Sequence, residues 1–495
     1  MSDTDRSDRK GERDPSARRV ARNTGLAIGA EVVGKAAPLV LFALIARILG
    51  ARTLGDYVLA FAVTSLIFPV ATLGMDRLLV REASQDRGAV DRLFFDLVAL
   101  KAIVSVGGVL AAAAVMALLG YPERVVTLTL LLGFATVLNI LGASALGVFQ
   151  AYERMEYHVY STLPQKYLSA GLGIAVLLLG GSIVAVAAGV LIASGVGLVI
   201  AFVLQFRFFR RPPLRIHAGR WRAIVRDAMP FGLQELFAQV LFRIDIVLLS
   251  LYTSSAVVGW YGASYRLLEA SLFVSWSVAS AVMPMFSYLG EDTRPSLSTV
   301  YEKSVKFLLA LTVPIGVVLV VEAEALIELI YGLERFDPSV GALRLLGGAL
   351  ILYAVTHLTG ALVLARRRGG PFVWATAGVA LLNVALNLVL IPRLSLDGAA
   401  AATLISELVL VVLALVLAQR LLGRLRLMAM ASGPLVAGAA MGIVMIALNG
   451  ELLLTLPLGT LAYLLVLCAF EFRRFREDAE VARSILRRRT ARQPG

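Results

Sequence analysis

A few ionisable side chains lie inside long apolar stretches of this sequence, where charges are rare. The basic ones are Lys35, Lys101, Arg243, Arg266 and Arg344. A charge at the centre of a lipid bilayer costs at least about 2.5 kcal/mol on insertion scales, so such a side chain normally faces a cavity or a partner. These cations are therefore candidates for binding an anionic group such as a phosphate.

Arg243 is the strongest of these candidates. Its planar guanidinium binds two phosphate oxygens at once and stays charged when water is excluded. Glu235, Gln239 and Arg243 follow one another at four-residue steps, which places them on one broad face of a helix. Asp245 lies about 200° around the same helix and so points elsewhere. A structural salt bridge from Arg243 to an acid on another helix is an equal alternative.

The other basic residues have acids close by in the sequence or add charge to the same region. Glu31 and Lys35 are four residues apart, so they either neutralise each other or leave Lys35 to meet a phosphate. Arg266 and Glu269 repeat this arrangement at a spacing of three. Lys101 would add a positive wall to the binding region.

Acidic residues inside apolar stretches are candidates for binding a coupling ion, Na+ or H+. These are Glu31, Glu235, Asp245 and Glu407. Intramembrane carboxylates mark ion pathways and proton relays in transporters. The sequence does not decide which of the four binds an ion.

The sequence offers no metal, redox or nucleotide site. The three histidines are far apart and Cys468 is the single cysteine, so we expect no metal, no disulfide and no cofactor. Residues 29–35 match most of a phosphate-binding P-loop, but Ala36 replaces the Ser or Thr that would hold magnesium. The match also lies inside an apolar stretch, not between a strand and a helix.

Apolar stretches of membrane-spanning length position these residues. About fourteen stretches come close to the roughly 20 residues that cross a bilayer as a helix. They lie near residues 24–46, 57–75, 93–119, 125–150, 158–179, 182–206, 228–252, 256–289, 307–321, 340–365, 371–391, 398–419, 427–448 and 452–470. The sequence therefore predicts an all-α polytopic membrane protein.

Positive charge alternates along the chain with a period of two stretches. Most of the 47 Lys and Arg fall in the two ends and the even-numbered loops. The odd-numbered loops contain only Arg47, Arg52, Arg124, Arg335 and Arg393. Because short loops rich in Lys and Arg stay cytoplasmic, both termini are predicted to be cytoplasmic.

Composition excludes several classes of protein. Hydrophobic residues make up 59% of the 495 residues and charged residues 16%, which leaves almost nothing for a soluble domain. The net charge of +13 follows from the basic cytoplasmic loops and favours contact with anionic lipid head groups over nucleic acid. We expect a multi-pass protein of the plasma or inner membrane.

The two halves of the chain resemble each other, which is typical of transporters. Gly55-Asp56-Tyr57 aligns with Gly259-Trp260-Tyr261 at the start of equivalent stretches. We predict two six-helix lobes followed by two further helices. The predicted parts are a disordered tail at 1–23, lobes at 24–206 and 228–420 joined by a basic linker at 207–227, helices at 421–470, and a basic tail at 471–495.

Short motifs in a fixed order resemble the Wzx-type oligosaccharide flippases, the polysaccharide-biosynthesis branch of the multidrug/oligosaccharidyl-lipid/polysaccharide exporter superfamily. They are Leu49-Gly50, Gly55-Asp56-Tyr57, Gly74 with Asp76-Arg77, Arg81-Glu82, Arg243 with Asp245, Asn383 with Asn387, Ile391-Pro392, and the run from Gly398 to Thr403. The resemblance covers nearly the whole chain. Ser395 departs from it, because the family commonly has glycine in the loop before Gly398.

The resemblance implies translocation of a lipid-linked oligosaccharide, on a polyprenyl or dolichyl pyrophosphate, from the cytoplasmic to the outer leaflet by alternating access. Glycosyltransferases or a polymerase of the same pathway would be partners, besides the membrane lipids. A peptidoglycan-precursor flippase and a drug/cation antiporter of the same superfamily are the alternatives.

A membrane glycan polymerase, an enzyme, is the alternative from another class. Such an enzyme needs positioned acids or bases, usually on an extended external loop. The largest external loop here is short, near 322–339, and we expect its acids, Glu322, Glu324 and Glu328, on an amphipathic helix. We therefore expect a transporter, with no catalytic residues.

Overall fold

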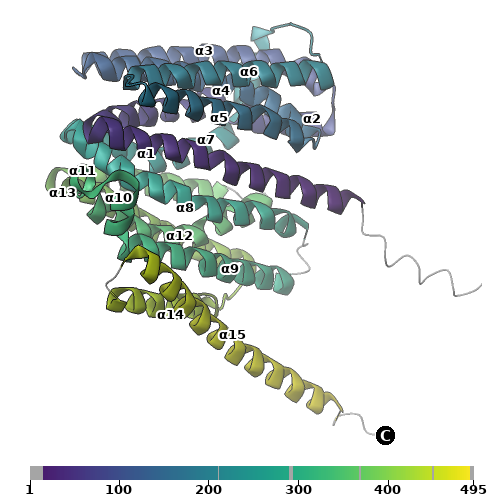
Figure 1. Ribbon diagram of the computed structural model, residues 1–495. Helices are drawn as coiled ribbons and strands as arrows, with labels where there is room; N and C mark the ends of the chain where they lie inside the picture. The colour runs from purple at the N-terminus through teal and green to yellow at the C-terminus, as the bar shows by residue number, and fades with distance from the viewer. Residues whose placement is uncertain (1–14, 210, 289–293, 367–369, 449–450, 491–495) are drawn as a thin grey trace, which may run out of the picture. The chain divides into compact units, whose positions relative to one another are not determined.

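The computed structural model describes residues 15–209, 211–288, 294–366, 370–448 and 451–490. Side chains are described at Gly34 and within 37–209, 211–229, 231–287, 297–366, 370–448 and 451–472. The regular elements of these residues are all helices, and none of the described residues forms a strand (Figure 1). The predicted all-α class is confirmed.

The first of two compact units contains the described residues up to Gly259. Its helices are α1 (Pro15–Thr72), α2 (Met75–Gln85), α3 (Ala89–Leu118), α4 (Glu123–Ala151), α5 (Met155–Leu178), α6 (Ile183–Phe208), the 3-10 turn η3 (Ala218–Arg220) and α7 (Trp221–Tyr252). The first turn of α8 (Ser255–Tyr288) also belongs to it. The long helices α3, α4, α5 and α6 run side by side (Figure 1).

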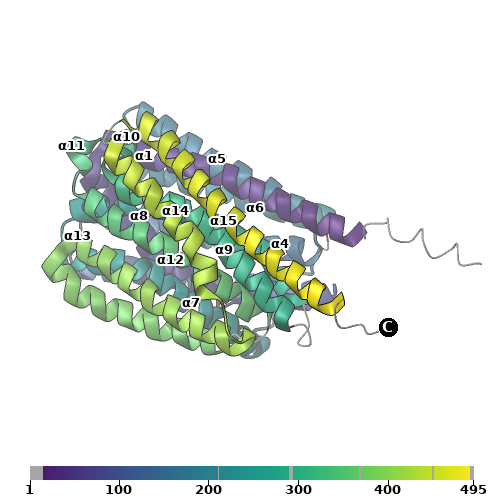
Figure 2. The same ribbon diagram turned by 90° about the horizontal axis from the view of Figure 1, so that it is seen from below.

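The second unit contains the described residues from Trp260 onward. It contains the rest of α8, then α9 (Arg294–Val321), α10 (Ala323–Tyr331), α11 (Leu333–Phe336), α12 (Ser339–Ala365), α13 (Gly370–Leu422), α14 (Leu427–Leu448) and α15 (Leu452–Thr490). Figure 2 shows α14 and α15 lying side by side at the yellow end of the chain. Apolar residues of α8, α9, α12, α13, α14 and α15 form a core cluster in it.

Ten helices of the described residues are long and apolar enough to cross a membrane. Two of them, α1 and α13, each contain two of the predicted apolar stretches, separated by one residue with non-helical backbone angles. Helices α5 and α7 are not among the ten. The protein is a multi-pass membrane protein, and the number of fourteen spans stays a prediction.

The breaks in these two helices occur at residues of different types, a glycine in α1 and a serine in α13. In α1 the break is at Gly50, with φ 77°, a conformation that glycine adopts without strain. In α13 it is at Ser395, with φ 55° and ψ −128°. A side chain at positive φ costs roughly 1 kcal/mol or more, so the family's usual glycine would fit this turn better.

Glycines allow two pairs of segments in the first unit to approach very closely. A Cβ on Gly232 of α7 would lie 2.4 Å from the carbonyl carbon of Leu73, and one on Gly74 would lie 2.5 Å from Cβ of Phe231. No Cβ fits at such distances. The start of α2 is therefore pressed directly against α7.

The second close approach joins α1 and the first turn of α8. A Cβ on Gly55 would lie 1.7 Å from the carbonyl oxygen of Ser255, and one on Gly259 would lie 1.9 Å from that of Ala51. The two glycines are the pair that the sequence aligned as equivalent. Each lies against the residue four positions before the other.

The boundary between the compact units falls one helix later than the predicted start of the second lobe at residue 228. Helix α7 packs against α1 and α2, and so belongs to the first unit. The predicted lobes are defined by repeated sequence motifs, whereas the compact units are defined by contacts between residues. The two divisions of the chain therefore need not coincide. The six-helix lobes stay a prediction.

Candidate functional site

The buried cation Lys101 lies at the centre of a charged cluster in the first unit. Its side chain on α3 is fully buried. The ammonium group forms an ion pair with Asp76 in the first turn of α2 and donates a hydrogen bond of 3.0 Å to Oγ of Ser144 on α4. Three helices thus meet at one lysine.

Helix α7 adds a carboxylate to this cluster. Close packing of Gly74 and Gly232 fixes the start of α2 against α7, three residues before Glu235. Glu235 lies within electrostatic reach of Asp76, Arg77 and Lys101. The cluster therefore contains two acids and two bases from α2, α3 and α7.

The ammonium group of Lys101 is therefore bound by a carboxylate and a hydroxyl, and it is not open to a ligand on all sides. The sequence predicted it as a positive wall for an anion, and the structure adds Asp76 as its partner. Arg77, next to Asp76, has an exposed side chain. Of the two bases in the cluster, Arg77 is the one that solvent or a ligand reaches.

Arg243 lies two turns beyond Glu235 on α7 and is half-buried. Its guanidinium carbon is 5.2 Å from the centre of the Phe61 ring of α1, a cation–π contact. Stacking uses the face of the guanidinium, whereas a phosphate is bound through its N–H edge, so the two contacts are compatible. Gln239, between them on the predicted polar stripe, is half-buried as well.

Asp245 differs from Arg243 in its surroundings. Its side chain is fully buried, and Oδ1 accepts a hydrogen bond of 2.8 Å from the backbone N–H of Ile246. Arg243 is half-buried two residues earlier. The different burial of these two residues agrees with their predicted positions on separate faces of α7.

The second unit contains the other predicted ionisable residues. Arg266 and Glu269 of α8 form the predicted pair, with 3.3 Å between Nη1 and Oε2. Glu407 of α13 is buried and accepts a hydrogen bond of 2.6 Å from Oγ1 of Thr356 on α12. Arg344 on α12 is exposed.

Two other polar groups of the second unit form hydrogen bonds within the helix bundle. The side-chain amide of Asn383 donates a hydrogen bond of 3.1 Å to Oγ of Ser406, which ties the two parts of α13 together. His357 accepts a hydrogen bond of 2.9 Å from the indole N–H of Trp276. Among the described residues no group of three His, Cys, Asp or Glu is placed to hold a metal ion.

Glu31 and Lys35 lie outside the residues whose side chains the structure describes. Their role as an ion pair or as a phosphate contact stays a prediction.

Three acids of the first unit with partners far along the chain were not among the predicted site residues. Besides Asp76, they are Asp56, which pairs with Arg124, and Asp96, whose Oδ1 accepts a hydrogen bond of 2.5 Å from the backbone N–H of His217. Asp56 and Asp76 belong to the family motifs Gly55-Asp56-Tyr57 and Gly74 with Asp76-Arg77, and this membership could have marked them as site candidates. Asp96 lies inside an apolar stretch and could have been found by the argument that selected Lys101.

Comparisons with known proteins place this arrangement in context. Residues 20–289, more than half of the chain, match the family model described as polysaccharide biosynthesis protein. The probable low-salt glycan biosynthesis flippase Agl15 of Haloferax volcanii is 26% identical over 163 residues. That match covers 33% of this chain and 34% of Agl15, about a third of the relative's length.

Solved structures of transporters share the fold. A structure of the lipid II flippase MurJ in an inward closed conformation superposes with a TM-score of 0.76 at 15% identity, covering 91% of this chain and 99% of MurJ. An inward-facing multidrug resistance MATE family transporter gives 0.65 at 17% identity, with 78% and 94% covered. At these identities the likeness concerns the fold.

Proposed function

Since the chain belongs to the polysaccharide biosynthesis protein family, we propose that it moves a lipid-linked oligosaccharide from the cytoplasmic to the outer leaflet of the membrane. The protein is a membrane transporter of the flippase superfamily, and its relatives are flippases, not enzymes. The proposal adds the cargo, a glycan on a polyprenyl or dolichyl pyrophosphate.

The observation that supports this cargo best is the position of Arg243. A half-buried guanidinium, in cation–π contact with Phe61 within the segment that matches the family, suits a pyrophosphate that arrives with its lipid tail still in the bilayer. Arg77 would extend the anion path toward the predicted cytoplasmic side. Lys101 and Arg266, each with an acidic partner, would contribute charge indirectly.

Ion coupling is part of the same proposal. Glu235 belongs to the charged cluster around Lys101, while Asp245 and Glu407 are buried. We propose one of these carboxylates as the site of a coupling Na+ or H+. Transport measured with and without an imposed gradient of each ion tests this, and indifference to both gradients would contradict it.

Arg243→Ala tests the proposed pyrophosphate contact. Cells that contain the intact gene, a deletion, or Arg243→Ala are compared for their lipid-linked oligosaccharide pool and their surface glycan. Because a hydrogen bond to a charged group contributes about 1.5 to 3 kcal/mol, we expect transport to fall by roughly tenfold or more. The lipid-linked pool should rise as surface glycan falls.

Arg420→Ala is the matched control, since it removes an exposed arginine from the last turn of another membrane helix, α13. It should behave like the intact protein at equal protein level. An Arg243→Ala strain with normal pools would remove Arg243 from the site. A deletion strain with normal pools would contradict the glycan cargo, and peptidoglycan-precursor and drug export would then be measured in the same strains.

A further inference from the structure

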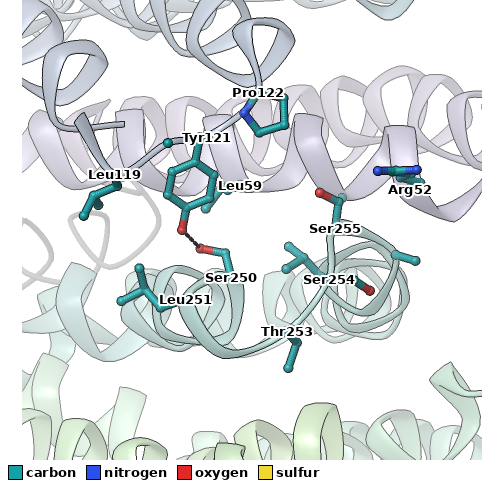
Figure 3. Close-up of a pocket in the computed structure, with 14 residues that line it drawn as sticks. Arg52, Leu59, Leu119, Tyr121, Pro122, Ser250, Leu251, Thr253, Ser254 and Ser255 are labelled. Atoms are coloured by element: carbon teal, nitrogen blue, oxygen red, sulfur yellow. Dashed lines mark hydrogen bonds between the residues drawn. The ribbon is translucent and has the colours of Figure 1, made fainter. Parts of the chain in front are cut away.

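The first unit contains a cavity of about 670 Å³ away from the charged cluster. Three segments line it: α1 just after its break, the turn between α3 and α4, and the junction between α7 and α8. Figure 3 shows α1 above the cavity and the α7–α8 junction below it, with Tyr121 reaching between them. The volume lies in the range of small-molecule sites, roughly 300 to 1,000 Å³.

The lining combines hydroxyl groups with apolar surface and one cation. Leu59, Leu119 and Leu251 supply apolar surface. The polar side chains are Arg52, Tyr121, Ser250, Thr253, Ser254 and Ser255. Polar and apolar surface contribute about equally to the lining, which is more polar than the mostly apolar wall of a typical small-molecule site.

The hydrogen bonds around Ser250 define which groups accept and which donate. Oγ of Ser250 donates to the carbonyl oxygen of Val247 at 2.7 Å. Since a serine hydroxyl has one proton, the 2.8 Å contact between Ser250 and Tyr121 must use the proton of Tyr121. Thr253 likewise donates to the carbonyl oxygen of Leu249 at 2.7 Å. These three hydroxyls therefore present acceptor lone pairs.

Donors come from the other side chains of the lining. The Arg52 guanidinium is a donor only, and the hydroxyls of Ser254 and Ser255 both donate and accept. A ligand that both gives and takes many hydrogen bonds, and has apolar C–H faces, matches such a wall. A sugar has this chemistry.

We propose that this cavity binds sugar units of the translocated glycan on the outer side of the membrane. The inference rests on the proposed function, which supplies the glycan. The predicted charge pattern supplies the side of the membrane, because it places all three lining segments in odd-numbered, external loops. The cavity would receive the sugar as it leaves the transport path. Arg243 would hold the pyrophosphate, and this cavity the glycan.

The test measures binding to the full-length protein in lipid nanodiscs. The first probe is the oligosaccharide released by mild acid from the cells' own lipid-linked pool, and the second is inorganic pyrophosphate. Tyr121→Phe removes a hydroxyl but keeps the ring, and Arg52→Gln removes the charge. We expect each variant to bind the oligosaccharide about fivefold more weakly and pyrophosphate unchanged.

Tyr160→Phe on α5 is the control, because it removes an exposed tyrosine hydroxyl far from the cavity lining. It should bind both probes as the unchanged protein does, and all three variants should keep its Tm. If the unchanged protein fails to bind the free oligosaccharide, or if the cavity variants match Tyr160→Phe, the proposal is wrong. Equal displacement of the oligosaccharide by glycerophosphate would also overturn it, in favour of a lipid head-group site.

Failure of this inference and failure of the proposed function give different results. A deletion that accumulates lipid-linked oligosaccharide, together with no binding of the free sugar, removes only the cavity site. The opposite result is also possible to recognise. If sugar binding depends on Tyr121 and Arg52 but the deletion changes no glycan pool, the proposed transport function is wrong and the sugar site remains.

Discussion

At the level of single residues, two buried ions in the described part of the first unit, Lys101 and Asp56, each have a partner of opposite charge far along the chain. Lys101 and Asp76 are 25 residues apart, and Arg124 and Asp56 are 68 residues apart. Asp96 instead accepts a hydrogen bond from the backbone N–H of His217, 121 residues away. A buried charge without such a partner is strongly unfavourable, so each acid and its partner form one structural unit.

Removing the ammonium group of Lys101 tests this coupling. Lys101→Met keeps the volume but leaves Asp76 without its cation, which we expect to cost about 3 kcal/mol and lower the Tm. Adding Asp76→Asn should restore part of the loss, because no net charge then remains. The Tm values of the two single variants and the double variant, purified in one detergent, give the result. Strictly additive losses would mean that the pair is not coupled.

The same residues show what the sequence predicts and what it does not. The Arg266–Glu269 pair was predicted because its members share one helix, where spacing defines neighbours. Lys101 was selected correctly as a buried ion, but its partner Asp76 was not predicted. That pairing depends on how α2 packs against α3, which no local pattern encodes.

At the level of helices, single residues decide where long apolar stretches turn and how closely they pack. The breaks at Gly50 and Ser395 were expected as loops between stretches, and each occupies only one residue of unusual backbone. Close packing of α2 on α7 was not expected. Glycines in apolar stretches are common in membrane helices, so their number does not reveal which ones face a neighbouring backbone.

Gly232→Ala tests the α2–α7 contact. The new Cβ would lie 2.4 Å from a backbone atom of Leu73, which cannot move without shifting α2. We expect a loss of about 1 to 3 kcal/mol, as for other overpacked sites, and a displaced Asp76. The measurement is the Tm of the purified protein.

Gly107→Ala in α3 is the matched control, since nothing lies within 4 Å of its Cβ position. It should be neutral or stabilising by up to about 1 kcal/mol, because alanine favours the helix. Equal Tm values for the two variants would contradict the close contact between Gly232 of α7 and Leu73 just before α2.

At the level of the whole molecule, the distribution of Lys and Arg predicts which loops face the cytoplasm. The fold agrees with this prediction within the first unit, where three loops of one predicted side line a single cavity. The helical class and the membrane location followed from composition and stretch length. The unit boundary at Gly259 did not, because it depends on which helices contact α7.

Cysteine labelling tests the predicted sidedness. Cys468 is the only native cysteine, so Cys468→Ser provides a background without thiols. In intact cells a membrane-impermeant maleimide should label Ser254→Cys, in the α7–α8 junction. Ser84→Cys, at the end of α2, should react only after permeabilisation. Both residues are exposed, so access depends on the side of the membrane. Labelling of both in intact cells, or the reverse pattern, would contradict the prediction.

The contact of Gly55 with Ser255 and of Gly259 with Ala51 has the form of a symmetric dimer interface, in which one surface meets a copy of itself. The two glycines are 204 residues apart in the sequence, and so are Ala51 and Ser255, the residues that they contact. Before duplication and fusion, one shorter chain with a single such glycine would have made the contact twice. A change in the ancestral glycine would have altered both halves of the interface at once. After fusion each copy became free to vary alone, which gives evolution a way to make this crossing asymmetric.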